Sequence, residues 1–468
     1  MDDFLREIQT SLFREWINNQ KRDYYHLHQS ETDPDAIIIE NEYCYSYVTF
    51  NPQCIIELCV MNKRTDEMAF YLHFQFKTLK HAISLFEEMD QCIKKMIDQP
   101  ICQLLLCCSG GMTTAFFADK IKNGIKVLNL NMEVAATSYQ KIYNVAQNYD
   151  VILLAPQVSY VKLQVEKVFK NKLVLKIPTQ IFASYNVGAL ITFVEESLKH
   201  KENKYNGYVE PLASMMEIKT NKNVLAVSIN ANGENSHISY RLYNSHQDIV
   251  LDSNIIKSNI KLQDVLDALD TVVLQNEMID VISIALPGVM VEGNVYSGII
   301  EGGNHQLKER LEKRYEKEIY LINDVNAAVV GYYASQNEYK SLAFLFQPIG
   351  RMAGSGIVVN GQLVRGMDHL AGEVALLPLK LSDSYLNLAN TPEGTLELVT
   401  KNIMSIIAIV SPEAIVVYSD LILDSQDVSD EIKKSLSQYS LKVYPKIIKV
   451  ENILEYILLG TMILSAKE

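Results

Sequence analysis

Short apolar segments alternate with helical segments over two long stretches of the chain, and this alternation limits the fold more than any other feature. In residues 101–200 the apolar segments are ICQLLLCC, IKVLNLN, DVILLAP and KLVLKIP. From residue 221 onward they are VLAVSI, VISIALPG, IYLIND, SLAFLFQPIG and AIVVYSD. Strands joined by helices pair in parallel, and the helices cover the faces of the sheet. Both stretches are therefore predicted to be α/β folds.

The first 99 residues have a different pattern. A polar helical stretch precedes the strand-like runs DAIIIENEYCYSYVTF, CIIELCVM and AFYLHFQF, and a helix is predicted in LKHAISLFEEMDQCIKKMI. This pattern indicates a small α+β domain, and none of its motifs indicates chemistry. The polar stretch KHKENKYNGY is predicted to be a linker. The predicted domains are residues 1–99, 101–200 and 221–468.

Composition excludes several classes of function. The net charge of -13 argues against non-specific nucleic-acid binding, which needs clustered Lys and Arg. No apolar run approaches the length of about 18 residues that spans a bilayer. The segment MDDFLREIQT lacks the basic and apolar regions of a signal peptide. We therefore expect a cytoplasmic protein that binds no nucleic acid.

The cysteines argue against a structural metal. All seven lie within the first 108 residues: Cys44, Cys54, Cys59, Cys92, Cys102, Cys107 and Cys108. No two of them form a CxxC pair, so neither a zinc site nor a framework of disulfides is predicted in a reducing compartment. We expect no metal and no cofactor.

One of these thiols stands at the start of a loop suited to an anion. Cys108 ends an apolar strand, and the predicted phosphate loop follows it with Ser109, Gly110, Gly111, Met112, Thr113 and Thr114. The glycines allow backbone N–H groups to converge on one anion, and the following helix adds positive potential at its N-terminus. The same field favours a thiolate. Cys108 is therefore a candidate phosphocysteine, whereas strand alternation points Cys107 the other way.

Two alternatives for this loop stay open. Both cysteines could simply end a core strand. A cysteine phosphatase is a second alternative, but its loop needs an arginine six positions after the nucleophile, where this chain has Thr114.

Residues 101–200 resemble the lactose/cellobiose class of enzyme IIB of the bacterial sugar phosphotransferase system (PTS). The resemblance rests on CCSGGMTT, DVILLAPQVSY and KIPTQIFASYNVGAL, in this order. It implies that Cys108 takes phosphate from a phosphohistidine on enzyme IIA, and it makes the membrane enzyme IIC a further candidate partner. It also implies that Pro156, Gln157 and Tyr160 flank the phosphate loop. Asn186 departs from the family, which commonly has glycine after the tyrosine.

Residues 221–468 resemble the ROK family of sugar kinases and sugar-responsive repressors. The matching motifs are SIALPGVMVEGNVY, LINDVNAAVVGYY, PIGRMAGSGIVVNGQLVRG and HLAGEVA. The resemblance implies an actin-like fold of two lobes that close on a sugar and ATP. It implies that Asp324 is the general base and that Glu373 holds the sugar, with Asn304 and Asn323 as further candidate sugar contacts. From its position after a strand, Asp324 could instead cap the next helix.

The nucleotide motifs of that family are replaced here. SINAN, residues 228–232, stands in place of Asp-x-Gly-Gly-Thr, and GRMAG, residues 350–354, in place of Gly-Thr-Gly-Ile-Gly. Tyr418 and Ser419 replace a later Gly-Gly pair. These changes remove a carboxylate that organises magnesium and add side chains where backbone must approach phosphate, including Met352. We predict that the ATP site is lost.

Two more positions bear on ligands. Leu376 stands where the family's zinc-binding histidine would be, which again predicts no zinc. Arg351 is a candidate phosphate contact, because a guanidinium can hold a phosphate through two hydrogen bonds. Alternatively, it pairs with a neighbouring carboxylate.

The sequence thus predicts a bacterial cytosolic regulator that is phosphorylated on Cys108 and binds a sugar or a sugar phosphate in a ROK-like pseudokinase. One alternative is a kinase for β-glucosides or amino sugars fused to a transporter IIB subunit. A ROK-type transcription repressor is another, disfavoured because residues 1–99 contain no DNA-binding motif. Whether the chain forms a homodimer is left open.

Overall fold

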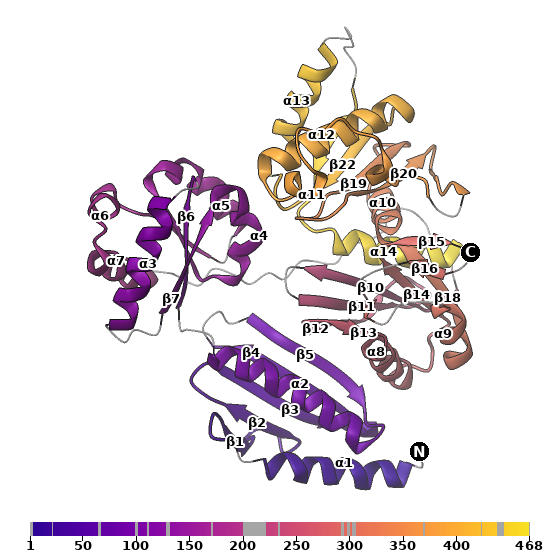
Figure 1. Ribbon diagram of the computed structural model, residues 1–468. Helices are drawn as coiled ribbons and strands as arrows, with labels where there is room; N and C mark the ends of the chain where they lie inside the picture. Colours follow the sequence, from indigo (N-terminus) through magenta and orange to yellow (C-terminus); the bar gives the residue numbers. More distant parts are fainter. Residues whose placement is uncertain are drawn as a thin grey trace.

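A computed structural model describes residues 3–20, 22–63, 67–98, 102–109, 112–127, 132–169, 172–199, 221–232, 235–291, 294–296, 300–301, 306–367, 370–422, 424–437 and 444–467. An N-terminal sheet with two helices, a separate α/β body and a pair of stacked lobes are distinguished in Figure 1. Of the predicted linker, only Lys199 lies within the described residues. No helix in the described part of the chain is long and apolar enough to cross a membrane.

The N-terminal region is an antiparallel sheet with helices on it, as its pattern predicts. Its elements are α1 (Asp3–Asn18), β1 (His26–Gln29), β2 (Ala36–Glu40), β3 (Cys44–Asn51), β4 (Ile55–Asn62), β5 (Glu67–Gln75) and α2 (Leu79–Asp98). The strands pair in chain order. The run DAIIIENEYCYSYVTF is a hairpin rather than one strand, because the Asn41 side chain accepts hydrogen bonds from the backbone N–H groups of Tyr43 and Cys44 and turns the chain.

The second region is a parallel sheet of four strands in the order β7-β6-β8-β9. Its elements are β6 (Cys102–Cys108), α3 (Met112–Val127), β7 (Met132–Ser138), α4 (Ile142–Val145), β8 (Val151–Leu154), α5 (Lys162–Val168), β9 (Leu173–Lys176), α6 (Thr179–Ser184) and α7 (Val187–Lys199). The strand predicted in IKVLNLN is wrong in its first part. Ile125 continues α3, because it buries one turn after Ile121 on the same helix face, and the strand begins at Met132.

The third region has two lobes. The first contains β10 (Val224–Asn232), β11 (Asn235–Tyr243), β12 (Ile249–Lys257), β13 (Ile260–Lys261), α8 (Leu262–Gln275), β14 (Val281–Leu286), β15 (Val289–Val291), β16 (Asn294–Tyr296), β17 (Ile300–Glu301), α9 (Leu307–Tyr315) and β18 (Glu318–Asn323). The second contains β19 (Leu342–Phe346), β20 (Gly354–Val359), β21 (Gln362–Leu363), α11 (Tyr385–Leu388), α12 (Pro392–Ile409), β22 (Ala414–Tyr418), α13 (Ser425–Ser437) and β23 (Lys446–Lys449).

Helices α10 (Asp324–Ala334) and α14 (Leu454–Lys467) pack against each other between the two lobes. Gly460 makes this contact close, because a Cβ atom there would lie 1.8 Å from the carbonyl oxygen of Ala327. The helix contact therefore holds the start of α10 in a fixed position between the lobes.

The N-terminal sheet continues into the first lobe. Tyr71 of β5 pairs with Ile256 of β12, so that one sheet runs β1-β2-β3-β4-β5-β12-β11-β10-β14-β18. Buried side chains of both regions form a single hydrophobic cluster. The predicted boundaries 1–99, 101–200 and 221–468 stay a prediction, and the shared sheet adds that the first and third segments are built onto each other.

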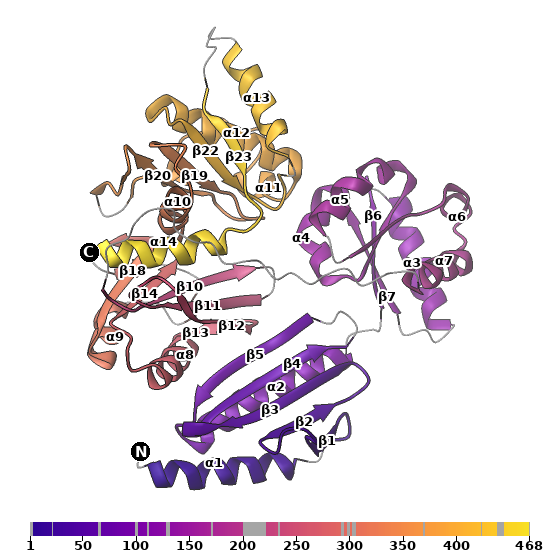
Figure 2. The same ribbon diagram turned by 180° about the vertical axis from the view of Figure 1, so that it is seen from behind.

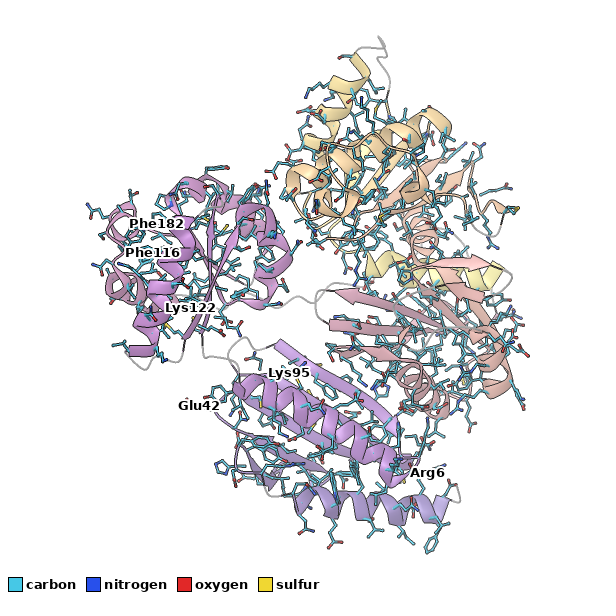
Figure 3. The ribbon with its side chains drawn as sticks, in the orientation of Figure 1. Arg6, Glu42, Lys95, Phe116, Lys122 and Phe182 are labelled. Carbon is cyan, nitrogen blue, oxygen red and sulfur yellow. The ribbon has the colours of Figure 1, made fainter. Side chains whose placement is uncertain are left out.

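The second region touches the second lobe through a small contact. The Tyr139 hydroxyl donates a hydrogen bond of 2.8 Å to Glu393 of α12. Leu421 of the lobe joins the hydrophobic core of the parallel-sheet region, and Ile349 packs against that core. In both views α4 lies on the side of this body that faces the lobes (Figures 1 and 2), and the side chains of both bodies are drawn in Figure 3.

Candidate functional site

Cys108 lies at the carboxyl edge of the parallel sheet. It is the last residue of β6, and its register partner is Ser138, the last residue of β7. The side chain is 6% exposed, and its thiol lies 3.9 Å from the carbonyl oxygen of Thr137. On the other side of β6, the Ala155 N–H donates to the Cys107 carbonyl at 2.9 Å, which brings the turn after β8 to the same edge.

The neighbouring Cys107 is fully buried, as strand alternation predicts. Burial raises the pKa of its thiol to about 12, so this group stays protonated at neutral pH. Of the two adjacent cysteines, Cys107 is therefore the less suited to act as a nucleophile.

The loop residues are only partly described. Ser109 is exposed, and residues 112–114 begin α3. Gly110 and Gly111 lie outside the described residues, as do the side chains of Met112, Thr113 and Thr114. The phosphate loop therefore stays a prediction.

Residues on neighbouring turns surround this edge. Pro156 and Gln157 begin the short helix Pro156–Val161, in which Tyr160 is exposed. Asn186 has a structural role that the departure from the family pattern did not indicate: its side chain accepts a hydrogen bond of 3.0 Å from the Ala189 N–H and caps α7.

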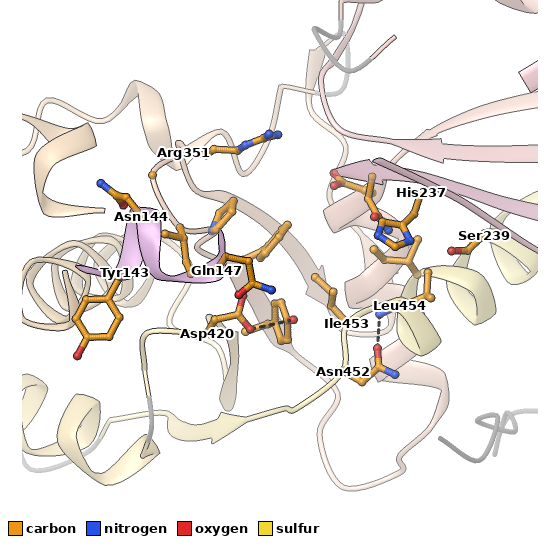
Figure 4. A pocket seen from close by; sticks show the side chains of 18 of the residues that line it. Tyr143, Asn144, Gln147, His237, Ser239, Arg351, Asp420, Asn452, Ile453 and Leu454 are labelled. Atoms are coloured by element: carbon orange, nitrogen blue, oxygen red, sulfur yellow. Dashed lines mark hydrogen bonds between the residues drawn. The ribbon is translucent and has the colours of Figure 1, made fainter. Parts of the chain in front are cut away.

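A second site is a cavity of about 700 Å³ between the two lobes and the parallel-sheet region (Figure 4). Asp324 lines it from the start of α10. The helix cap is the preceding residue, Asn323, whose side chain accepts from the N–H groups of Val325 and Asn326 at 3.1 and 3.0 Å. The alternative that Asp324 is the cap is therefore wrong.

Asp324 has the electrostatics of a buried carboxyl group. Burial raises its pKa to about 6, opposed by a hydrogen bond from the Val325 N–H, and the nearby Glu373 raises it further. Burial also raises the pKa of Glu373. The structure thus brings these two predicted sugar ligands within electrostatic range of each other.

The other two candidate sugar contacts differ from them. The Asn323 amide is engaged within the protein, because its nitrogen donates to the Gly288 carbonyl at 3.1 Å while its oxygen caps α10. Asn304 lies outside the described residues. The roles of all four as sugar ligands stay predictions.

The positions of the replaced nucleotide motifs divide into two groups. Asn230, Arg351 and Tyr418 line the cavity. Ser228 is buried with an unpartnered hydroxyl oxygen, and Met352 is 48% exposed; neither is among the lining residues. The side chain that replaces phosphate-binding backbone in the cavity is therefore that of Arg351, not the expected Met352.

Sequence reasoning missed two sets of polar side chains in the cavity. His237, Ser239 and Asn254 come from the antiparallel strands β11 and β12, and Asn144 and Gln147 come from α4 and the turn after it. No local sequence pattern predicts that these residues share a cavity, because the strands β11 and β12 and helix α4 of the parallel-sheet region come together only in the folded chain. Among the described residues, no cluster of three or more His, Cys, Asp or Glu could hold a metal ion.

Comparison with known families identifies both regions. Residues 103–192 match the family "PTS system, Lactose/Cellobiose specific IIB subunit", and residues 231–394 match the ROK family. The chain is a fusion of a IIB-like domain and a ROK domain. Both resemblances inferred from the motifs are confirmed, as is the fold class: an N-terminal α+β region, a parallel IIB-like sheet and an actin-like ROK region.

Several solved structures are similar to parts of this chain. A ROK family protein from Streptococcus pneumoniae TIGR4, in complex with sucrose, is 18% identical, covers 52% of this chain and 97% of its own, and gives a TM-score of 0.42. A ROK hexokinase from Thermus thermophilus is 16% identical over 52% and 99%, with a TM-score of 0.42. A lactose-specific IIB domain from Streptococcus pneumoniae is 23% identical over 20% and 95%, with a TM-score of 0.19. No curated protein matches the chain.

Proposed function

We propose that this chain is a bacterial cytosolic regulator of carbohydrate uptake. Its IIB-like domain carries phosphate on Cys108, and its ROK domain binds a sugar or a sugar phosphate without phosphorylating it. A IIB-like domain implies partners from the PTS. Enzyme IIA is the proposed donor, and the membrane enzyme IIC is a further candidate partner. In the transfer, the Cys108 sulfur attacks phosphorus, and a sulfur–phosphorus bond forms as the bond to the enzyme IIA histidine breaks.

One observation carries the sensing part of this proposal. The cleft retains the buried carboxyl group of Asp324, but the positions of the phosphate and adenosine motifs present the side chains of Asn230, Arg351 and Tyr418 to the cavity. Loops that cradle a triphosphate present backbone N–H groups, usually from glycine. Side chains at these positions stand where such a loop would present its backbone, and they supply hydrogen bonds suited to a polyol.

A short segment supports coupling between the two domains. Ser138 is the register partner of Cys108, and the next residue, Tyr139, is hydrogen-bonded to Glu393 of the ROK domain. The segment then forms α4 and brings Asn144 and Gln147 to the cavity. A phosphate on Cys108 and a ligand in the cleft would therefore act on the two ends of one segment, and their effects on each other would be reciprocal.

Phosphate transfer tests the first half of the proposal. When the full chain is incubated with phosphorylated enzyme IIA and the general phosphotransferase proteins, we expect acid-labile phosphate on Cys108. Cys108→Ser should lose the label. Cys107→Ser, the matched control, should keep it, because Cys107 is buried with a raised pKa. Normal labelling of both single variants would limit the IIB-like domain to a structural role.

Nucleotide titration tests the second half against the kinase alternative. That alternative has one observation in its favour: a carboxyl group with a pKa of about 6 suits a general base at neutral pH. We expect no saturable binding of ATP–Mg²⁺ at millimolar concentration and no sugar-dependent ATP turnover. Measured turnover would make the chain a kinase.

Sugar binding should also depend on pH. If the Asp324 carboxylate accepts a hydrogen bond from a sugar hydroxyl, affinity should fall as pH drops through about 6, because the group becomes protonated. Calorimetric titration between pH 5 and pH 8 measures this, and Asp324→Asn should remove the dependence together with most of the affinity.

A further inference from the structure

The cavity is shared by two domains. On one side it is lined by the ROK cleft, and on the other by α4 of the IIB-like domain and the residues after it (Figure 4). We propose that the two domains together form one binding site for an uncharged saccharide of more than one ring. This proposal rests on the proposed function, and it names the ligand class and adds the IIB-like domain to the site.

Charge favours an uncharged ligand. Among the residues that line the described cavity, the guanidinium of Arg351 is accompanied by two carboxyl groups, those of Asp324 and Asp420. A nucleotide triphosphate or another polyanion needs an excess of positive charge or a metal ion. The described lining provides neither, so a polyanionic ligand would meet net repulsion once both carboxyl groups are ionised.

The remaining side chains suit hydroxyl groups. The lining includes the amides Asn144, Gln147, Asn230, Asn254, Asn390 and Asn452. An amide both donates and accepts hydrogen bonds, as a sugar hydroxyl does. The rings of Phe346 and Tyr418 also line the cavity, with their centroids 5.5 Å apart. The two rings are tilted by 50° to each other, and the face of either ring offers an apolar surface to the C–H face of a sugar ring.

A hydrogen-bond relay orients one donor in the wall. The Ser239 hydroxyl donates to the Asn254 oxygen at 3.1 Å, and the Asn254 nitrogen donates to Nδ1 of His237 at 3.3 Å. Burial lowers the pKa of His237, which favours the neutral ring. Because the Asn254 amide nitrogen can only donate, Nδ1 accepts and the ring proton lies on Nε2. The relay therefore fixes the ring as a neutral hydrogen-bond donor, which suits a hydroxyl oxygen.

The volume suits a ligand that contacts both domains. At about 700 Å³, the cavity falls within the range of about 300–1,000 Å³ that is usual for pockets that bury a small-molecule ligand. Asp324 begins a helix of the ROK domain, whereas Asn144 and Gln147 belong to the IIB-like domain. In Figure 4, Asn144 and Gln147 lie across the cavity from His237 and Ser239 of the ROK domain. A ligand that contacts both walls must extend across the cavity. A disaccharide offers one ring to each wall, whereas one ring bound at Asp324 would leave the IIB-like wall unused.

Calorimetric titration of the full chain with cellobiose, lactose, glucose and glucose 6-phosphate tests the proposal. We expect at least one of the two disaccharides to bind more tightly than glucose. The double variant Asn144→Ala/Gln147→Ala should weaken that disaccharide by about tenfold, the effect of losing two hydrogen bonds, while glucose binding stays unchanged. Gln140→Ala is the matched control, because Gln140 is an exposed amide just before α4 and is not among the lining residues.

Other outcomes separate failure of this inference from failure of the proposed function. Disaccharide binding that is lost in Asp324→Asn but unchanged in the double variant would overturn the shared site and leave the sensor intact. Glucose 6-phosphate binding more tightly than the disaccharides would overturn the uncharged class. Absence of binding by all four probes would overturn the sensor and, with it, the shared site.

Discussion

Two regions are attached to the ROK domain in different ways. The N-terminal region is attached by a continuous sheet, a shared hydrophobic cluster and polar contacts, among them the buried pair of His73 with Tyr240 at 2.9 Å and the partly buried pair of Lys77 with Asp267 at 2.6 Å. The IIB-like domain is attached through the hydrogen bond between Tyr139 and Glu393 and through a few apolar side chains such as that of Leu421.

The difference separates a structural role from a regulatory one. Burying a common core makes two regions unfold together, since neither keeps its hydrophobic surface covered alone. A contact made of one hydrogen bond and a few apolar side chains can open and close without unfolding either partner. The N-terminal region is thus expected to act as part of the ROK lobe, and the IIB-like domain as a separate unit.

The largest predicted effect comes from the shared core. Phe74 of β5 is fully buried in the cluster that joins the N-terminal region to the first lobe. Phe74→Ala should lower the free energy of unfolding by about 3–5 kcal/mol. In scanning calorimetry, the transition of the N-terminal region and the ROK domain should move as one.

The matched control lies in the other core. Leu153 is fully buried in the IIB-like domain, and Leu153→Ala should lower a different transition. If Phe74→Ala also moved the IIB transition, the IIB-like domain would not unfold as a separate unit. If it split the ROK transition in two, the N-terminal region and the ROK domain would not unfold together.

The next effect depends on pH. Burial lowers the pKa of His73 to about 4, although Asp267 opposes the shift. The ordinary value is about 6.5, so between pH 6.5 and pH 4 the unfolded chain takes up a proton that the folded chain does not. Stability should therefore fall as pH drops through this window, by roughly 3 kcal/mol from this group.

Denaturant unfolding at several pH values measures that loss. His73→Gln should reduce the slope of stability against pH in this window. His246→Gln, at an exposed turn position, serves as the control and should leave the slope as it is. An unchanged slope in His73→Gln would mean that water reaches His73 at the contact between the N-terminal region and the ROK domain.

The smallest effect belongs to the IIB attachment. Tyr139→Phe removes the hydrogen bond to Glu393 and should cost about 1 kcal/mol of docking free energy. Hydrogen exchange in α4 should then accelerate up to about fivefold, with no shift of the ROK transition. Tyr160→Phe, an exposed tyrosine of the same domain, should change neither. A shift of the ROK transition in Tyr139→Phe would contradict a separable contact.

Much of the fold was determined locally. The apolar runs around Cys108, Asp324 and Tyr418 form the strands that their patterns predict, because a buried parallel strand needs an unbroken apolar segment. The family motifs lie on these strands and on the turns after them, so both domains were identifiable without a structure. The end of α3 was not, since IKVLNLN suits a helix and a strand equally until packing decides.

Only the tertiary structure decided the attachments and the shared cavity. The pairing of Tyr71 with Ile256 joins residues far apart in the chain, and its strands carry no mark of their partner. Likewise, the sequence shows Asn144 and Gln147 only as polar residues suited to a surface. They line the cavity only because the fold brings α4 and the turn after it to the cleft of the ROK domain. Local sequence sets which backbone conformation is favourable, but which surfaces meet depends on the burial of the whole chain.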